Sequence, residues 1–144
     1  MISDDFYMQE ALKEARKAAD LDEVPVGAIV VCNDRIIARA HNLSELLHDP
    51  TAHAEMQAIT SAGNHLGAKF LDDCTIYVTI EPCVMCAGAL FWSRIGKLVY
   101  GAKDEKRGYS KVKSSLLHPK TVVISGVLEE PCGKLMTEYF KQKR

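Results

Sequence analysis

The pattern of apolar and polar positions predicts a helix followed by a hairpin at the start of the chain. Ser3 suits the N-cap of the helix. The apolar face of this helix consists of Phe6, Ala11, Ala15 and Ala18. Residues 24–31 are rich in β-branched side chains and predict a strand, Asn33 and Asp34 indicate a turn, and the apolar pattern resumes at Ile36.

The middle of the chain predicts two helices separated by a strand. The first of these helices should begin near residues 49–51 and end close to Gly63 or Gly67. Residues 74–80 alternate apolar side chains and predict a strand. Residues 82–91 predict a buried apolar helix, since proline is favoured at the first helical position, where Pro82 would stand.

The C-terminal third predicts two short strands and a helix. Residues 97–100 and 121–124 are typical of strands, whereas residues 103–120 between them are polar and basic without a clear period. The final helix keeps an apolar face made of Cys132, Leu135, Met136, Tyr139 and Phe140. Helices that alternate with strands after an opening hairpin indicate an α/β fold, a mixed sheet covered by helices on both faces.

Composition indicates one globular domain over residues 1–144. The chain is 47% hydrophobic and 26% charged, and a domain of this length can fold without disulfides or a structural metal. Its longest apolar stretch, residues 24–32, is far too short to cross a membrane. Asp4 and Asp5 stand where a signal peptide would be basic. We therefore expect a cytoplasmic protein with no membrane partner.

Charge is distributed unevenly along the chain, although the formal net charge is only −1. Residues 1–93 hold 6 Lys/Arg and 14 Asp/Glu, whereas residues 94–144 hold 12 and 5, a net charge of +7. A basic half of this kind can face a polyanion. The alternative is a solvated surface on which the charges balance around the folded molecule.

The chain has five cysteines, of which only Cys83 and Cys86 lie close together. An odd number at these spacings does not form a disulfide framework. Residues i and i+3 share a helical face, so both thiolates of the pair can reach one metal ion, and His53 can supply a third ligand. Three protein ligands leave one position of a tetrahedral zinc ion open for water, which is the arrangement of a catalytic site. We therefore expect one zinc ion per chain.

Glu55 follows His53 by two residues, a spacing at which two side chains do not share a helical face. We expect its carboxylate beside the bound water instead of on the metal, where it can move protons. The cysteine pair could instead be a redox pair or half of a structural zinc site. A structural site needs a fourth protein ligand, for which the candidates are His48, Cys74, His118 and Cys132. Neither alternative explains Glu55.

The order H-x-E followed by P-C-x-x-C, with Cys83 30 residues after His53, is the signature of the zinc nucleobase deaminases. Over most of residues 1–108, the chain resembles the bacterial tRNA-specific adenosine deaminases. The segments that carry this resemblance are residues 23–28, Asn42, 48–55, 77–88 and 93–96. The resemblance implies a three-layer α/β/α, cytidine deaminase-like fold with a central mixed five-stranded sheet. It also implies a homodimer that converts adenosine to inosine at the wobble position of a tRNA anticodon.

The same resemblance implies roles for individual residues. His53, Cys83 and Cys86 would hold the zinc ion, and Glu55 would be the general acid and base. The substrate-binding positions would be Asn42 at the purine, Val24 and Ile80 in the pocket wall, and Asp104 at the RNA backbone. Each of these roles has an alternative. Val24 and Ile80 could be ordinary core residues, Asn42 could be a turn residue, and Asp104 could be a surface acid without a function.

Residues 109–120 depart from the family pattern, being shorter than and different from the proteobacterial sequences. The candidate RNA contacts in and near this segment are Lys106, Arg107, Lys111 and Lys113. Phosphate neutralisation by such cations dominates nonspecific affinity for nucleic acids. A first alternative is a deaminase of a free base, nucleoside or nucleotide such as guanine, cytosine or deoxycytidylate. A more distant alternative is a noncatalytic zinc or RNA-binding module, which a fourth protein ligand on the metal would favour.

Overall fold

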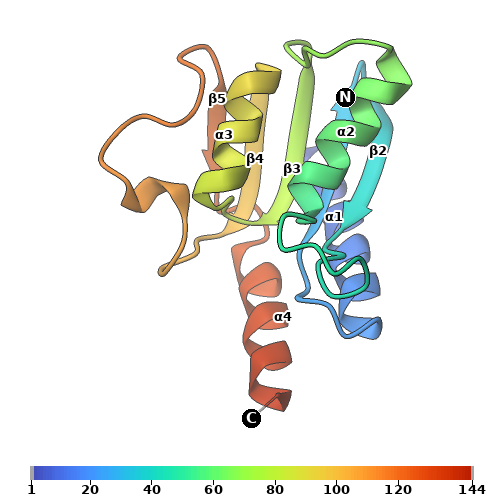
Figure 1. Ribbon diagram of the computed structural model, residues 1–144, viewed down its shortest axis with the longest axis vertical. Helices are drawn as coiled ribbons and strands as arrows, with labels where there is room; N and C mark the ends of the chain where they lie inside the picture. Colours follow the sequence, from blue (N-terminus) through green and yellow to red (C-terminus); the bar gives the residue numbers. More distant parts are fainter. Residues whose placement is uncertain (1, 144) are drawn as a thin grey trace.

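The computed structural model describes residues 2–143, which contain the four helices and five strands that the sequence predicts (Figure 1). A short 3-10 helix, η1, precedes the last strand. In chain order the elements are α1 (Asp4–Asp20), β1 (Gly27–Cys32), β2 (Arg35–His41), α2 (Ala54–Leu66), β3 (Cys74–Ile80), α3 (Val84–Ser93), β4 (Lys97–Ala102), η1 (Tyr109–Lys111), β5 (Val122–Ser125) and α4 (Glu129–Gln142).

The five strands form one mixed sheet in the order β2-β1-β3-β4-β5. Strand β1 runs antiparallel to both β2 and β3, whereas β3, β4 and β5 are parallel to one another. Parallel strands need a crossover connection, and α3 provides the one between β3 and β4. The carboxyl ends of β3 and β4 therefore meet at the same edge of the sheet.

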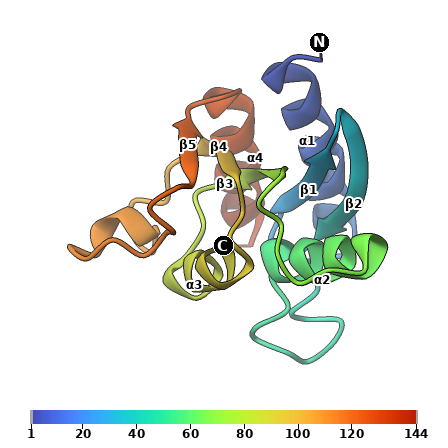
Figure 2. The ribbon, with the colours of Figure 1, turned by 90° about the horizontal axis from the view of Figure 1, so that it is seen from above.

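Helices cover both faces of the sheet, which confirms the expected three layers (Figure 2). On one face, Ala54, Ala58 and Ala62 of α2 pack with Ile76 and Leu98 of the sheet, and all five side chains are fully buried or nearly so. On the other face, α1 and α4 pack over the remaining core side chains. Burial of each large aliphatic side chain contributes about 1.5–3 kcal/mol, so these two layers provide most of the favourable energy of folding.

Helix α1 begins as predicted, because the Ser3 Oγ accepts a hydrogen bond from the Phe6 N–H at 3.2 Å. Ala11, Ala15 and Ala18 are buried, as expected, but the placement of Phe6 in the core is wrong, since its side chain is 49% exposed. Tyr7 lies one turn before Ala11 on the buried stripe and takes that place.

The predicted start of α2 near residues 49–51 is wrong, because the helix begins at Ala54. The Asp49 Oδ1 accepts hydrogen bonds from the Thr51 N–H at 2.9 Å and the Thr51 hydroxyl at 2.7 Å, so the residues form a local turn that competes with a helix. The helix ends at Gly67, in the left-handed conformation that favours glycine.

Two further boundaries differ from the prediction. Pro82 does not begin α3: Cys83 is extended and forms a β-bridge with Gly108, so the helix starts at Val84. Strand β1 starts at Gly27 and not at Val24. A Cβ on Gly27 would lie 2.1 Å from the Ala11 carbonyl oxygen, so only glycine allows β1 to approach α1 this closely. In the described part of the chain, each helix is too short or too polar to cross a membrane.

Candidate active site

The N-termini of α2 and α3 supply the three predicted metal ligands. His53 is the N-cap of α2 and Cys83 is the N-cap of α3, and both have an extended backbone. Neither side chain caps its own helix, so both are free to face another group. Cys86 lies in the first turn of α3, three residues after Cys83. The sheet brings these helix ends together, because Cys83 follows the carboxyl end of β3.

The three ligand atoms lie at distances that suit a zinc ion. The His53 Nδ1 is 3.7 Å from the Cys83 Sγ and 3.6 Å from the Cys86 Sγ, and all three atoms lie within 4.8 Å of one another. Tetrahedral zinc with bonds of roughly 2.1 Å to nitrogen and 2.3 Å to sulfur places these atoms about 3.5 Å apart. Within residues 2–143 this is the one group of its kind.

None of the four candidate fourth ligands, His48, Cys74, His118 and Cys132, belongs to this group in the described chain. The two cysteines are also free thiols and not a disulfide, as are the other three cysteines. The arrangement therefore offers three protein ligands, which is the number that leaves one coordination position for water.

The electrostatics of the group favour a bound cation. The hydrogen bond from the Cys86 thiol, together with a smaller effect of the hydrogen bond with His53, lowers the pKa of Cys83 to about 4 against the opposing effect of burial. The Cys83 sulfur in turn raises the pKa of Cys86, and burial raises it again, so the two thiols share one proton. The same Cys83 sulfur raises the pKa of His53. The partial positive charge at a helix N-terminus adds to the preference for thiolate.

Glu55 lies beside this group in the first turn of α2 and is only 4% exposed. Burial raises its pKa to about 7, and the charge of Cys83 acts in the same direction. The Cys86 thiol interacts with the Glu55 carboxylate, whose oxygens are not among the three clustered ligand atoms. A carboxyl group with a pKa near neutrality can both accept and release a proton at physiological pH.

Asn42 lies just after β2 and is 6% exposed. Its side-chain oxygen is buried without a hydrogen-bond partner in the described chain. An unsatisfied buried acceptor costs about 1–3 kcal/mol, so a hydrogen bond from a ligand donor would recover this energy. A turn residue would not need this burial.

The two predicted pocket-wall residues lie in different surroundings. Ile80 is 7% exposed and packs in the core on the α1 and α4 face of the sheet. Val24 is half-buried and lines a cavity of about 500 Å³ that also includes Leu46 and Tyr139. No ligand of the metal group lines this cavity.

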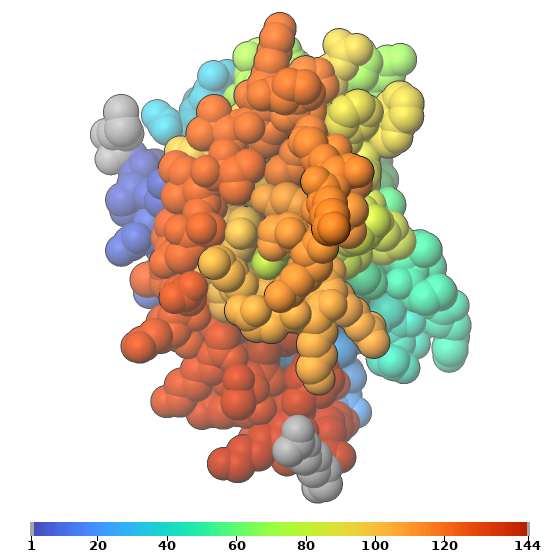
Figure 3. Space-filling model, turned by 90° about the vertical axis from the view of Figure 1, so that its left-hand side faces the viewer, coloured from blue at the N-terminus to red at the C-terminus, as the bar shows by residue number. Residues whose placement is uncertain are grey.

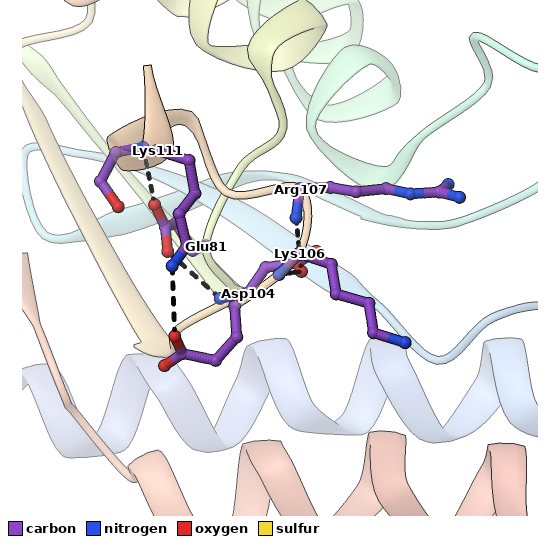
Figure 4. A network of polar contacts seen from close by, with 7 residues as sticks. Glu81, Asp104, Lys106, Arg107 and Lys111 are labelled. Atoms are coloured by element: carbon purple, nitrogen blue, oxygen red, sulfur yellow. Dashed lines mark hydrogen bonds and ion pairs between the residues drawn. The ribbon is translucent and has the colours of Figure 1, made fainter. Parts of the chain in front are cut away.

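The segment between β4 and β5 carries the predicted RNA contacts and covers much of the face seen in Figure 3. The Asp104 Oδ1 accepts hydrogen bonds from the Lys106 N–H at 3.0 Å and the Arg107 N–H at 2.9 Å, so it closes a turn (Figure 4). Lys106, Arg107, Lys111 and Lys113 are all exposed, and the first three share one loop. Lys111 forms an exposed ion pair with Glu105 at 3.5 Å.

Two buried glutamates were missed as functional candidates, although both fall in segments that carry the family resemblance. Glu23 is 1% exposed and accepts hydrogen bonds from the backbone N–H groups of Glu45 and Leu46, at 2.9 and 2.7 Å. Glu81 is 3% exposed and binds the next loop in the same way. A carboxylate at the end of a buried apolar strand was the signal that could have identified Glu81.

Comparisons with known proteins agree with this site. A family model described as MafB19-like deaminase matches residues 2–144. A tRNA-specific adenosine deaminase of Bacillus subtilis (strain 168) is 48% identical over 149 aligned residues, covering 100% of this chain and 92% of that protein. A structure solved in studies of A-to-I editing by tRNA:A34 deaminases matches with a TM-score of 0.85 and 41% identity, over 90% of this chain and 98% of that chain. A guanine deaminase of Bacillus subtilis matches with a TM-score of 0.68 and 38% identity, over 71% of this chain and 66% of that chain.

Proposed function

Because this chain belongs to the family of the tRNA-specific adenosine deaminases, we propose that it hydrolyses adenosine to inosine at the wobble position of a tRNA anticodon. The observation that carries the proposal is the meeting of His53, Cys83 and Cys86 beside the buried Glu55. In the reaction, a water oxygen bonds to C6 of the purine, the C6–N bond breaks, and the amino group leaves as ammonia.

The donor set of His53, Cys83 and Cys86 fits one zinc ion per chain. When bound there, zinc supplies the Lewis acidity that makes water a nucleophile near neutral pH. The side chain of Glu55 performs the proton transfers: its carboxylate takes a proton from the attacking water and delivers it to the ring, and then passes the proton of the new C6 hydroxyl to the departing amino group. Its burial beside Cys86 supports this role, because the carboxyl is held close to the group without being a ligand.

The purine is held by residues around this group. The unpaired Asn42 oxygen accepts a hydrogen bond from the base, which removes the cost of leaving it buried and unsatisfied. Val24 and Ile80 line the pocket, as the family resemblance implies. An unpaired anticodon loop suits this arrangement, because exposing a base there costs less than extruding it from a duplex.

The loop after β4 supplies the contacts to the RNA backbone. Lys106, Arg107, Lys111 and Lys113 are exposed cations that neutralise phosphates. Asp104 acts mainly through the turn that it closes, since one of its carboxylate oxygens already accepts two backbone N–H groups. A tRNA substrate also favours a cytoplasmic location.

A homodimer is part of this proposal, formed through the outer surface of α3. Val84, Phe91 and Trp92 on this helix are 48%, 36% and 77% exposed, and an exposed tryptophan beside other apolar side chains is typical of a protein interface. A second copy of the chain would cover them, and the family that the sequence resembles is homodimeric.

The test is to incubate the zinc-loaded protein with total tRNA and, separately, with free guanine, cytosine, adenosine and cytidine. We expect inosine and ammonia from tRNA alone. The likeness to a guanine deaminase makes a free base the second candidate. Ammonia from a free base at a rate equal to that on tRNA would contradict the proposal, and loss of the tRNA reaction with added salt would support it.

A further inference from the structure

Glu81 is a buried carboxylate that holds a loop by its backbone. It follows the last residue of β3, and its side chain lies within the protein at 3% exposure. One carboxylate oxygen, Oε1, accepts the Asp104 N–H at 3.1 Å, and the other, Oε2, accepts the Ser110 N–H at 3.0 Å (Figure 4). Hydrogen bonds to a charged acceptor are about twice as strong as those between neutral groups.

The two donors stand near the two ends of the loop of residues 104–111, which we term the cationic loop. Between them the loop is closed by its own hydrogen bonds, since the Gly108 N–H donates to the Asp104 carbonyl at 3.0 Å. The side chains of Lys106, Arg107 and Lys111 are exposed, and Lys111 pairs with the exposed Glu105 of the same loop. Because Glu81 accepts these hydrogen bonds from backbone N–H groups, it holds the loop without forming an ion pair with the cationic side chains.

The cationic loop is attached to the same segment that carries the first cysteine ligand. Gly108 forms a β-bridge with Cys83, and the Tyr109 N–H donates to the Pro82 carbonyl at 2.9 Å. The contact with Glu81 is close, because a Cβ on Gly108 would lie 2.4 Å from the Glu81 carboxylate. Any displacement of the loop would therefore change its distance from the metal ligands.

We propose that Glu81 is a positioning residue that fixes the cationic loop at the edge of the metal group, so that phosphates bound by the loop place the target base at the reacting centre. This inference rests on the proposed function, since RNA is what the exposed cations would meet. Glu81 touches neither base nor phosphate and acts through the backbone of residues 104 and 110.

The test is equilibrium binding of an anticodon stem-loop RNA at several salt concentrations, in a Glu55→Ala background that prevents turnover. Glu81→Gln keeps the shape of the side chain but leaves only one acceptor oxygen. Its NH2 group would face the second backbone N–H, and two donors cannot form a hydrogen bond with each other. We expect Kd to rise about tenfold, with zinc content per chain unchanged. The slope of log Kd against log[salt] should also fall by about 0.7 for each phosphate contact that is lost.

Two further variants separate positioning from charge and from misfolding. Glu105→Gln removes the same charge from an exposed position of the same loop, so it should lower Kd or leave it unchanged. A purely electrostatic role for Glu81 would make Glu81→Gln behave like this control. Gly108→Ala keeps Glu81 but forces the loop away from it, and should reproduce the rise in Kd and the smaller slope.

Equal Kd and equal slope for Glu81→Gln and its parent would overturn the inference. If Glu81→Gln loses zinc or does not fold, Gly108→Ala decides, and native RNA binding by that variant would overturn the inference. Failure of the Glu55→Ala parent itself to bind the stem-loop would instead contradict the proposed function, on which the inference depends.

Discussion

His53 and Cys83 each begin a helix, and each leaves its side chain free for a neighbour from another element. An N-cap side chain usually turns back to accept a hydrogen bond from its own helix. Neither His53 nor Cys83 does so, and each side chain can therefore contact another element. Glu55, two residues into α2, turns into the protein and is buried beside the three ligand atoms. His53 and Glu55 are only two positions apart, and this spacing places one at the ligand group and the other beside it as a proton carrier.

The role of Glu55 is testable by removing its carboxylate. Glu55→Ala should retain zinc, because the three ligands remain, and should lose about 10²–10⁴-fold in turnover, the usual contribution of a general acid or base. Inosine formation and metal content per chain measure the two effects. Glu129→Ala removes an exposed first-turn glutamate from α4 and should turn over normally. Undiminished ammonia release by Glu55→Ala would refute the assignment.

Among the elements, the loops around the site are held by buried carboxylates and the helices by close contacts with the sheet. Glu23 holds the loop that leads to His53, and Glu81 holds the loop that follows β4. Each uses both oxygens on backbone N–H groups, so the loops are ordered without apolar cores of their own. Helix α1, by contrast, packs directly against the backbone of β1 at Gly27, where no side chain separates the two elements.

The contact between α1 and β1 predicts a strong effect of Gly27→Ala. The added Cβ would lie 2.1 Å from the Ala11 carbonyl oxygen and 2.5 Å from the Ala15 nitrogen, and both atoms belong to helix backbone that cannot yield locally. We expect a loss of about 3 kcal/mol in the free energy of unfolding, measured with urea. Gly133→Ala is the matched control, because its Cβ would meet only the Ala102 Cβ at 3.5 Å, and it should stabilise α4 by about 0.5–1 kcal/mol.

The attachment of α1 to β2 predicts a dependence of stability on pH. Hydrogen bonding from Lys13 at 2.7 Å lowers the pKa of Glu10, as does Arg39 of β2 at 3.0 Å, against the opposing effect of burial. A lowered pKa in the folded state means that this stabilisation is present above the ordinary glutamate pKa and disappears as the pH falls through the folded value. Glu10→Gln should therefore cost about 1 kcal/mol at pH 7 and progressively less below about pH 4.

Urea unfolding of wild type and Glu10→Gln, at pH 7 and again below about pH 4, measures this difference in the free energy of unfolding. Glu138→Gln serves as the control, since its pair with Lys134 is exposed and lies within one helix. A cost for Glu10→Gln that stays constant with pH would show that the loss comes from packing and not from the charge.

The whole molecule places its chemistry where the parallel strands β3 and β4 end. Ligands of open α/β sheets commonly bind outside the carboxyl ends of the strands, and here these ends lead to Cys83 and to the cationic loop. Two outer surfaces on the same face of the sheet differ: α3 exposes a tryptophan and a phenylalanine, whereas the segment between β4 and β5 is basic. The molecule thus separates an apolar surface from a cationic one.

The apolar surface of α3 predicts that Trp92→Glu weakens self-association. A charge buried in a dimer interface without a partner is strongly unfavourable, so sedimentation should show dimer for the wild type and monomer for the variant. Phe140→Glu on α4 also replaces an exposed aromatic residue, 46% exposed, and should leave the dimer intact. An unchanged sedimentation coefficient for Trp92→Glu would exclude α3 as the interface.

Local signals along the chain determined the elements and the chemistry of the ligands. The cap at Ser3, the five strands and the spacing of Cys83 and Cys86 depend on neighbours within a few residues, so they could be predicted from the sequence. The spacing of His53, Glu55 and the cysteine pair already indicated zinc chemistry, and the family signature supported it, because this motif combines residue types that few other sites need.

Only the tertiary structure decided how those pieces meet. The extended backbone of Cys83 depends on a bridge to Gly108, 25 residues away, which a helical period cannot predict. Tyr7 replaces Phe6 in the core because its ring packs against Tyr77 of β3 and its hydroxyl donates to the Asp34 carbonyl, contacts that only the folded chain provides. The hydrogen bonds of Glu81 to residues 23 and 29 positions later form only when the sheet has closed, since a carboxylate cannot show in sequence which N–H groups the fold brings to it.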